Sequence, residues 1–428
     1  MIRINEIKQS LDGTKEDLFK ACKKALRIND EQIKSITIAR QSVDSRKKDN
    51  VFFCYTVDVE FNGDEEKLVK RINSKKIQLV ESYKYEMPEN KRNSKFRPVV
   101  VGFGPAGIFA ALTLARAGLK PIVLERGRDV DSRTKDVNTF FTQKILDETS
   151  NVQFGEGGAG TFSDGKLTTG IKNTLCRKVF LEFYAHGAPE EILYSGKPHI
   201  GTDRLAGVVK SMRQEIVSLG GEVMFECKLT DLIVYNSSVQ GVVYEKNGKS
   251  YDLETDTAII AIGHSARDTV RMLYSKGIQM MQKPFSVGAR IEHPREMIDK
   301  SQYGAFAGHK ALGAADYKLA CHGEHERGAY TFCMCPGGTV VAATSEKGGV
   351  VVNGMSEWAR DGRNSNSALL VNVYPEDFPS PENLPVVEKA TVLLGWKNFD
   401  PENSSSEAYK KYLYVRISLK KRYKIYMR

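Results

Sequence analysis

The first 90 residues alternate between the two-residue period of strands and the 3.6-residue period of amphipathic helices. The pattern predicts six elements in the order βαββαβ, which suggests a small ferredoxin-like α+β domain with a split βαβ arrangement. The segment PENKRNSKFR that follows is polar and charged, as is typical of a linker. We therefore expect a domain over 1–90 and a linker over 91–97. The predicted strands cover 2–7, 33–40, 51–61 and 77–85, and the predicted helices cover 14–26 and 64–72.

The apolar pattern then changes to a strand, a glycine turn, a helix and a second strand. This segment reads PVVVGFGPAGIFAALTLARAGLKPIVLER, with the helix predicted from Pro105 to about Ala117. Gly102 permits a tight turn after the first strand, and Gly104 lets backbone N–H groups approach a pyrophosphate. Gly107 lets the helix pack closely on the strand. The spacing is that of a dinucleotide-binding turn, with the diphosphate at the helix N-terminus.

Glu125 ends the second strand of this unit. A carboxylate at this spacing from the glycines accepts hydrogen bonds from ribose hydroxyls and repels a 2′-phosphate, which disfavours NADP. A merely structural turn is the first alternative, and the strand, helix and acid around the glycines argue against it. A membrane span is the second alternative. The uncharged run from Val99 to Ala115 is shorter than the ~20 apolar residues of a span, and Gly102, Gly104 and Pro105 interrupt it.

A second glycine-rich segment follows at 154–167, with the sequence FGEGGAGTFSDGKL. Its five glycines argue against regular structure and offer several backbone N–H groups to a ligand. Ser163, Asp164 and Lys166 are the polar side chains that we expect to contact the ligand. A flexible surface loop is the alternative, although Phe154 and Phe162 favour an ordered loop.

The pattern over residues 202–262 predicts one helix and several short strands. The helix covers Thr202–Leu219, is expected to be capped by Thr202 or Asp203, and stops at Gly220 and Gly221. A β-meander and an apolar return strand ending in AIG follow, which differs from a plain NAD-binding fold and is common in flavoproteins. We expect a Rossmann-like FAD-binding domain with an inserted meander. The meander strands are predicted over 222–226, 229–235, 239–245 and 251–254, and the return strand over 257–262.

Six segments together resemble the uncharacterised FAD-dependent dehydrogenases, relatives of the glutathione-reductase-type flavoproteins. The segments are VVVGFGPAGIFAALTLARAG, VLERG, FGEGGAGTFSDGKL, AIGHSARDT, FSVGARIEHP and FCMCPGGTVVAATSE. The resemblance implies FAD, with adenine near the backbone of Lys228 and Leu229 and the return strand near the cofactor. The residues expected at the cofactor are Gly102, Gly104, Pro105, Ala106, Gly107, Glu125, Arg126, Gly157, Gly158, Gly160, Thr161, Ser163, Asp164, Lys166, Lys228, Leu229, Ala261 and Gly263.

The resemblance places the FAD-binding domain at 98–281 and a substrate or cap region at 282–384, and it ends near Pro385. Related proteins carry a further G-[DE]-G-A-G segment near the C-terminus that brings N–H groups to the flavin pyrimidine end. Here the last glycine is Gly395, and residues 385–428 form an atypical basic tail. We interpret this as a missing or altered C-terminal part. We expect weaker FAD binding, because a positive helix end near the flavin stabilises the reduced anion.

Few side chains are candidates for catalysis. Cys333 and Cys335, in FCMCPGG, could form a redox pair, and structural thiols are the alternative. His264 could act as acid or base beside the flavin, or could bond only to backbone. His322 and His325 have no further ligand placed by the sequence, so we expect no metal. Outside this set, Lys166 and Arg290 are possible anion contacts.

Charge and cysteine usage exclude several classes of protein. The formal net charge is +10, but eight positive residues between 410 and 428 account for most of it, so a specific nucleic-acid partner is not expected. Seven scattered cysteines indicate no disulfide framework. The N-terminus MIRINEIKQS has no apolar signal region, which predicts a cytoplasmic protein that does not bind a membrane.

We therefore expect an FAD-dependent oxidoreductase that acts on an unidentified small molecule, with NAD(P)H as a possible electron donor. A non-catalytic or truncated flavin- or nucleotide-binding protein and a plain NAD-binding dehydrogenase are the alternatives.

Overall fold

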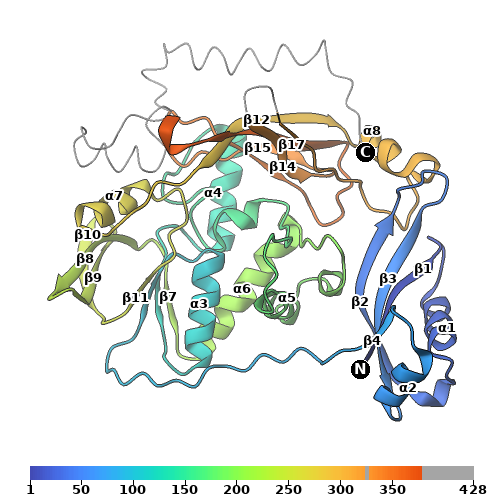
Figure 1. Cartoon of the computed structure of the whole chain (residues 1–428). Coiled ribbons are helices and arrows are strands. Elements are labelled where there is room, and N and C mark those ends of the chain that lie inside the picture. Colours follow the sequence, from blue (N-terminus) through green and yellow to red (C-terminus); the bar gives the residue numbers. More distant parts are fainter. Residues whose placement is uncertain (323–326, 378–428) are drawn as a thin grey trace.

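A computed structural model of the chain describes residues 1–322 and 327–377. It is a mixed α/β structure with parallel and antiparallel sheets (Figure 1). The expected basic tail over 385–428 and the second histidine of the His322–His325 pair lie outside the described residues. Across 1–322 and 327–377, no helix is both long and apolar enough to cross a membrane.

The N-terminal part is a four-stranded antiparallel sheet with two helices. The strand order is β2-β3-β1-β4, and the predicted order of six elements is confirmed. Thr14 caps the first helix, because its side chain accepts from Asp17 N and the Asp17 carboxylate accepts from Thr14 N. Ile2, Ile4, Leu26, Val57 and Val59 are among the buried residues between sheet and helices. The elements are β1 (Ile2–Gln9), α1 (Lys15–Leu26), β2 (Ile33–Asp44), β3 (Phe52–Phe61), α2 (Glu65–Ile72) and β4 (Ile77–Leu79), with a 3-10 turn η1 (Asp30–Gln32).

The last strand of this sheet is shorter than the predicted 77–85. Leu79 is already paired with Ile2, the first residue of β1, and Val80 N donates to Met1 O. Beyond that point β1 offers no further backbone partner, so β4 ends. Residues 80–98 contain no helix or strand. In Figure 1 they run as an extended segment from the N-terminal sheet to the central part.

The central part is a four-stranded parallel sheet in the order β11-β5-β6-β7. Val99, Val100 and Val101 of β5 are all buried, since helices α3 and α6 cover one face and the meander packs on the other. The strands are β5 (Val99–Val101), β6 (Ile122–Leu124), β7 (Glu222–Met224) and β11 (Ala258–Ile260). The accompanying helices are α3 (Pro105–Arg116), α4 (Val130–Gln143), α5 (Leu175–Ala185), α6 (Thr202–Ser218) and α7 (Arg267–Ser275), with 3-10 turns η2 (Gly158–Phe162) and η3 (Glu190–Leu193).

Three predictions for this part were wrong. The strand predicted over 222–226 does not belong to the meander, because β7 pairs in parallel with β6 after the crossover through α6. Neither Thr202 nor Asp203 caps α6. The N-cap is Gly201, while the Thr202 hydroxyl donates to Thr161 O and the Asp203 carboxylate accepts from Trp358 N. The 154–167 segment is not wholly irregular either, since it contains η2.

The meander has three strands, β8 (Lys228–Tyr235), β9 (Ser238–Lys246) and β10 (Lys249–Glu254). A further antiparallel sheet, in the order β12-β17-β14-β13, lies across the top of the parallel sheet and its helices in Figure 1. We call it the upper sheet. Its elements are β12 (Phe285–Pro294), α8 (Arg295–Tyr303), η4 (Gly304–Phe306), β13 (Ala320–His322), β14 (Gly328–Cys335), β17 (Asn364–Val373) and η5 (Pro375–Asp377), beside the two-stranded ribbon β15 (Thr339–Ala342) and β16 (Val352–Met355).

The N-terminal sheet is joined to the rest of the structure through its edge strand β2. Gln41 N donates to Tyr194 O, and Gly196 N donates to Gln41 O, each at 2.7 Å. Nearby, Lys48 Nζ donates to Gln302 O at 2.5 Å. These bonds satisfy backbone groups that an open sheet edge would leave exposed.

Candidate functional site

A cavity of about 470 Å³ opens where the parallel strands end. Val101, Leu124 and Ile260, the last residues of β5, β6 and β11, all line it. In open α/β sheets, ligands bind at the carboxyl ends of the strands. The cavity therefore lies where the fold favours ligand binding.

The three glycines of the first turn have different roles. A Cβ on Gly102 would lie 2.4 Å from Ala261 O, and the φ of Gly102 is +97°. A Cβ on Gly107 would lie 1.9 Å from Gly102 O. Both glycines are thus required for close backbone packing. A Cβ on Gly104 meets only Gly158 Cα, at 3.6 Å, so the space at Gly104 belongs to the cavity.

Helix α3 presents its N-terminus to this space. Gly104 is the N-cap and supplies no side-chain cap, and Pro105 is the first helical residue. The first N–H groups of a helix have no intrahelical partner, and the helix dipole is positive at this end. An anion beside Gly104 would accept hydrogen bonds from these N–H groups and would be attracted by the positive end of the helix dipole.

Glu125 connects the two glycine-rich segments. It is 5 % exposed, and its carboxylate accepts from three backbone N–H groups. Oε2 accepts from Phe103 N at 2.7 Å, and Oε1 accepts from Gly127 N at 2.9 Å and from Gly155 N at 3.0 Å. A carboxylate has about four acceptor positions, so one remains on Oε2 for a ligand hydroxyl.

Arg133, on α4, holds the second glycine-rich segment in shape. Its side chain is fully buried and donates to five backbone carbonyls, at 2.6–3.3 Å. Those carbonyls belong to Asn151, Val152, Gly155, Glu156 and Gly158. Because one guanidinium binds all five carbonyls, it fixes the backbone of a segment that forms one wall of the cavity. Burial lowers the pKa of Arg133 to about 10.

Sequence reasoning missed Arg133, since an arginine in a polar helix is usually solvated. It also missed several residues of the cavity wall. The lining residues that were not predicted include Gln153, Phe154, Gly155, Ala159, Cys227, Ile262, Ser265 and Thr269.

Arg126 forms part of the cavity rim. Its guanidinium lies 4.4 Å from the centre of the Phe154 ring, and it donates to Asp268 at 2.9 Å and to Thr269 Oγ1 at 2.8 Å. These contacts fix a flat cation at the edge of the cavity, joining β6 to α7.

His264 also lines the cavity. Its Nδ1 lies 2.7 Å from Ser265 Oγ, and Ser265 Oγ lies 3.4 Å from Gln153 Oε1. His264 Nδ1 is therefore paired with a side chain and not with the backbone. Desolvation and the nearby charge of Arg267 lower the pKa of His264, so the imidazole is neutral at pH 7.

The structure brings together many of the residues predicted at the cofactor and separates others from them. Those that line the cavity are Gly102, Gly104, Pro105, Ala106, Glu125, Arg126, Gly158, Gly160, Leu229, Ala261 and Gly263. Those that do not line it are Gly107, Gly157, Thr161, Ser163, Asp164, Lys166 and Lys228. The catalytic candidates Cys333 and Cys335 do not line the cavity either.

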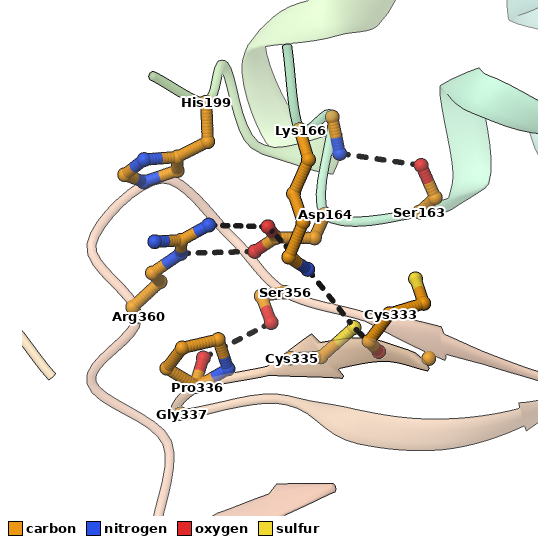
Figure 2. A network of polar contacts seen from close by, with 12 residues as sticks. Ser163, Asp164, Lys166, His199, Cys333, Cys335, Pro336, Gly337, Ser356 and Arg360 are labelled. Carbon is orange, nitrogen blue, oxygen red and sulfur yellow. Dashed lines mark hydrogen bonds and ion pairs between the residues drawn. The ribbon is translucent and has the colours of Figure 1, made fainter. Parts of the chain in front are cut away.

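Part of this second group belongs to a different arrangement, which Figure 2 shows. Asp164 is 1 % exposed and forms an ion pair with Arg360, whose Nε lies 2.9 Å from Oδ1. Lys166 Nζ lies 2.8 Å from Asp164 Oδ2 and 3.6 Å from Cys335 Sγ. We call Asp164, Lys166, Cys333, Cys335 and Arg360 the loop–sheet cluster, because it joins the 154–167 segment to the upper sheet.

The same cluster perturbs the pKa of Asp164. Burial alone would raise it, but the hydrogen bonds and charges of Arg360 and Lys166 outweigh burial and lower the pKa of Asp164. Asp164 is thus an anion that holds the 154–167 segment against the upper sheet.

Two family models match the chain. One, described as "FAD-dependent protein, C-terminal domain-like", matches residues 284–393, and the other, a domain of unknown function (DUF8436), matches residues 1–60. The first match supports FAD as the cofactor, which the family resemblance implied.

Several solved structures are similar at a low level. Thermovibrio ammonificans THI4 is 17 % identical with a TM-score of 0.31, over 44 % of this chain and 66 % of that chain. A triple mutant of the flavin-dependent brominase Bmp2 is 12 % identical with a TM-score of 0.31, over 73 % and 64 %. A geranylgeranyl bacteriochlorophyll reductase-like protein from Thermoplasma acidophilum is 13 % identical with a TM-score of 0.33, over 70 % and 60 %. The chain thus spans less than two thirds of these chains' lengths, and at such TM-scores the likeness carries no conclusion about its chemistry.

A curated relative is much more similar. An uncharacterized protein of Clostridium beijerinckii is 51 % identical over 379 residues, which cover 88 % of this chain and 70 % of the relative. Identity at this level over most of both chains requires a shared fold. The chain therefore belongs to the same family as this uncharacterized Clostridium beijerinckii protein.

Proposed function

We propose that the protein is an FAD-dependent oxidoreductase that binds FAD in the cavity at the end of the parallel sheet. One observation carries the proposal. The uncapped N-terminus of α3 faces a cavity in which Gly104 leaves space that no protein atom fills. A pyrophosphate fits this place, because it needs N–H donors, a positive dipole end and close approach to the backbone.

The other parts of the cofactor follow the cavity walls. The remaining acceptor position on Glu125 suits a ribose hydroxyl, and Cys227 and Leu229 offer an apolar wall for adenine. The wall formed by Gln153–Gly160 and by Gly263, His264 and Ser265 would then hold the flavin end. When bound, FAD supplies the hydride or electron transfer.

The protein's own residues orient and protect the reacting groups. Arg133 fixes the backbone of the Gln153–Gly160 wall through the five carbonyls that it binds. His264, neutral at pH 7, can accept a proton from a substrate group at the cavity wall. We further propose that 98–281 is the FAD-binding unit and that 282–384 supplies the substrate side, because the loop–sheet cluster joins the two regions.

The visible spectrum of the full-length purified protein tests this function. We expect a bound yellow chromophore, or quenching of FAD fluorescence on titration, and bleaching when NADH or NADPH is added under anaerobic conditions. Bound flavin that no nicotinamide reduces would favour a non-catalytic flavoprotein. A colourless protein that binds NADH and rejects FAD would overturn the proposal in favour of a plain NAD-binding dehydrogenase.

A further inference from the structure

Two cysteines, Cys333 and Cys335, lie at an irregular point of strand β14. The register between β14 and β17 shifts between Phe332 and Cys335, and Cys333 has a left-handed backbone with φ of +48°. Cys335 Sγ lies 3.3 Å from Cys333 O. Cys333 is partly exposed and Cys335 is buried. Cys333 is therefore the more exposed residue of the pair.

Cationic and amide groups from three other elements converge on these thiols. Lys166 Nζ, from the 154–167 segment, lies 3.6 Å from Cys335 Sγ (Figure 2). Arg290, on β12, donates from one guanidinium nitrogen to Cys333 O at 3.2 Å and to Asn366 Oδ1 at 2.5 Å. A Cβ built on Gly354 would lie within 2.6 Å of Cys335 Sγ, Arg290 Nη1 and Asn366 Oδ1, so these three groups meet at one point.

Asn366, on β17, supplies an independent sign that this point receives a ligand. Its side chain is fully buried, and its Nδ2 finds no hydrogen-bond acceptor among residues 1–322 and 327–377. An unsatisfied buried donor is costly, so folded proteins contain few of them, and a bound group that accepts from the donor is one way in which the cost is removed. The Asn366 amide lies next to Arg290 and the two cysteines, where an anionic or polar group would satisfy it.

The local charge favours a thiolate at Cys333. Lys166 and Arg360 both pair with the Asp164 carboxylate, and Arg290 donates to Cys333 O and Asn366 Oδ1, so three cations and the Asp164 carboxylate lie beside the two cysteines. Hydrogen bonding from Cys335 and the charges of Lys166 and Arg290 outweigh burial and lower the pKa of Cys333. The same contact, together with burial, raises the pKa of Cys335.

We propose that Cys333 and Cys335 form a redox-active dithiol that reduces a small disulfide. The Cys333 thiolate attacks one sulfur of the disulfide RS–SR, so that a mixed disulfide Cys333–S–S–R forms and RS⁻ leaves. The Cys335 thiol then attacks the Cys333 sulfur, and its proton passes to the second departing RS group. The products are a Cys333–Cys335 disulfide, RSH and RS⁻. The two electrons come from the two thiols, so this step needs no flavin.

The pH dependence of alkylation tests the thiolate. Full-length protein is treated with iodoacetamide between pH 6.5 and 8.5, and each cysteine is followed by peptide mass spectrometry. An ordinary thiol with a pKa near 8.5 gains on the order of fifty-fold in thiolate over this range. We expect the Cys333 rate to change less than about twofold, while exposed Cys321 serves as the reference thiol. Lys166→Met should move the Cys333 profile to higher pH, and Lys172→Met, which removes an exposed lysine nearby, should not.

Oxidised glutathione tests the exchange reaction. We expect a Cys333–Cys335 disulfide in the wild-type protein and a glutathione adduct on Cys333 in Cys335→Ser. If Cys335→Ser does not fold, the Cys333–Cys335 disulfide in the wild-type protein is the deciding result. A Cys333 alkylation profile as steep as that of Cys321, or glutathione found on Cys321 with none on the pair, would overturn the proposal. Neither readout requires bound FAD, so failure here is distinct from failure of the FAD site.

Discussion

Oε1 of Glu125 accepts a hydrogen bond at 3.0 Å from the backbone N–H of Gly155, across 30 positions of the sequence. Through this bond, the residue that directly follows β6 also fixes the second glycine-rich segment, while its other oxygen holds the first glycine turn at Phe103 N. Both walls of the cavity therefore depend on one carboxylate. A substitution of Glu125 should therefore disturb both walls at once.

Glu125→Ala should destabilise the fold and reduce FAD binding together. Three buried N–H groups would lose their acceptor, at about 1–3 kcal/mol each, so we expect a loss of at least about 3 kcal/mol in the free energy of unfolding. Chemical denaturation followed by circular dichroism measures it. Glu254→Ala removes an exposed glutamate of β10 and should change stability little. A Glu125→Ala protein as stable as the wild type would contradict the geometry described.

Gly104→Val should abolish FAD binding and leave the fold intact. The nearest protein atom to a Cβ at Gly104 is 3.6 Å away and its φ is negative, so the added side chain enters the cavity and not the protein. FAD titration and thermal unfolding measure the two effects. Gly170→Val, at an exposed glycine with open space around it, is the matched control. Unchanged flavin affinity in a folded Gly104→Val protein would exclude this turn as the pyrophosphate site.

Gly107→Ala should have the opposite profile. Its Cβ would lie 1.9 Å from Gly102 O, so α3 must move away from β5. We expect a loss of about 1–3 kcal/mol, as for overpacking elsewhere, and a lower melting temperature even without FAD. A melting temperature equal to that of the wild type would contradict the close contact between α3 and the Gly102 backbone.

Arg133→Met should destabilise the 151–158 segment. Five carbonyls would lose a charged donor in a buried site, and we expect a loss of about 3–5 kcal/mol with weaker FAD binding. Arg133→Lys keeps the charge but cannot reach all five carbonyls, so most of the loss should remain. Arg128→Met is the control, because that arginine is partly exposed and its ion pairs contribute under about 1 kcal/mol. Equal effects of the Arg133 and Arg128 changes would refute the role given to Arg133.

Asp164→Asn should reduce stability in a pH-dependent way. The pKa of Asp164 is lowered in the folded state, so its charge contributes stability above the ordinary aspartate pKa of about 4. That contribution is lost as pH falls through the lower folded value. The difference in unfolding free energy from the wild type should therefore be largest near pH 7 and shrink below about pH 4. A difference that stays constant from pH 7 to pH 3 would show that the charge is not involved. Asp252→Asn, at an exposed position, is the control.

Local chemistry explains what was predicted correctly. The turn at Gly102, the start of α3 at Pro105 and the acid at Glu125 lie within one βαβ unit. In such a unit, the number of residues between these features fixes their positions relative to one another. The order of six elements in the first 90 residues follows in the same way from periodicity, and so do the three strands β8, β9 and β10.

Tertiary contacts explain what the pattern along the chain did not show. We expected Ser163, Asp164 and Lys166 to contact the same ligand as Gly158 and Gly160, but the structure does not place them in the cavity wall. Instead, Asp164 pairs with Arg360, 196 positions later in the chain. Similarly, Glu222–Met224 joins the parallel sheet because β6 offers it an edge, which periodicity does not reveal.

The sequence by itself determined that a glycine turn, a helix N-terminus and an acid would stand together, because all three arise within 29 residues of continuous chain. Only the tertiary structure decided that Arg133 is buried among carbonyls and that Cys333 and Cys335 meet Lys166 and Arg290. Burial and the pairing of distant charges depend on how separate segments pack, and packing across the chain leaves no periodic signal in the segments themselves.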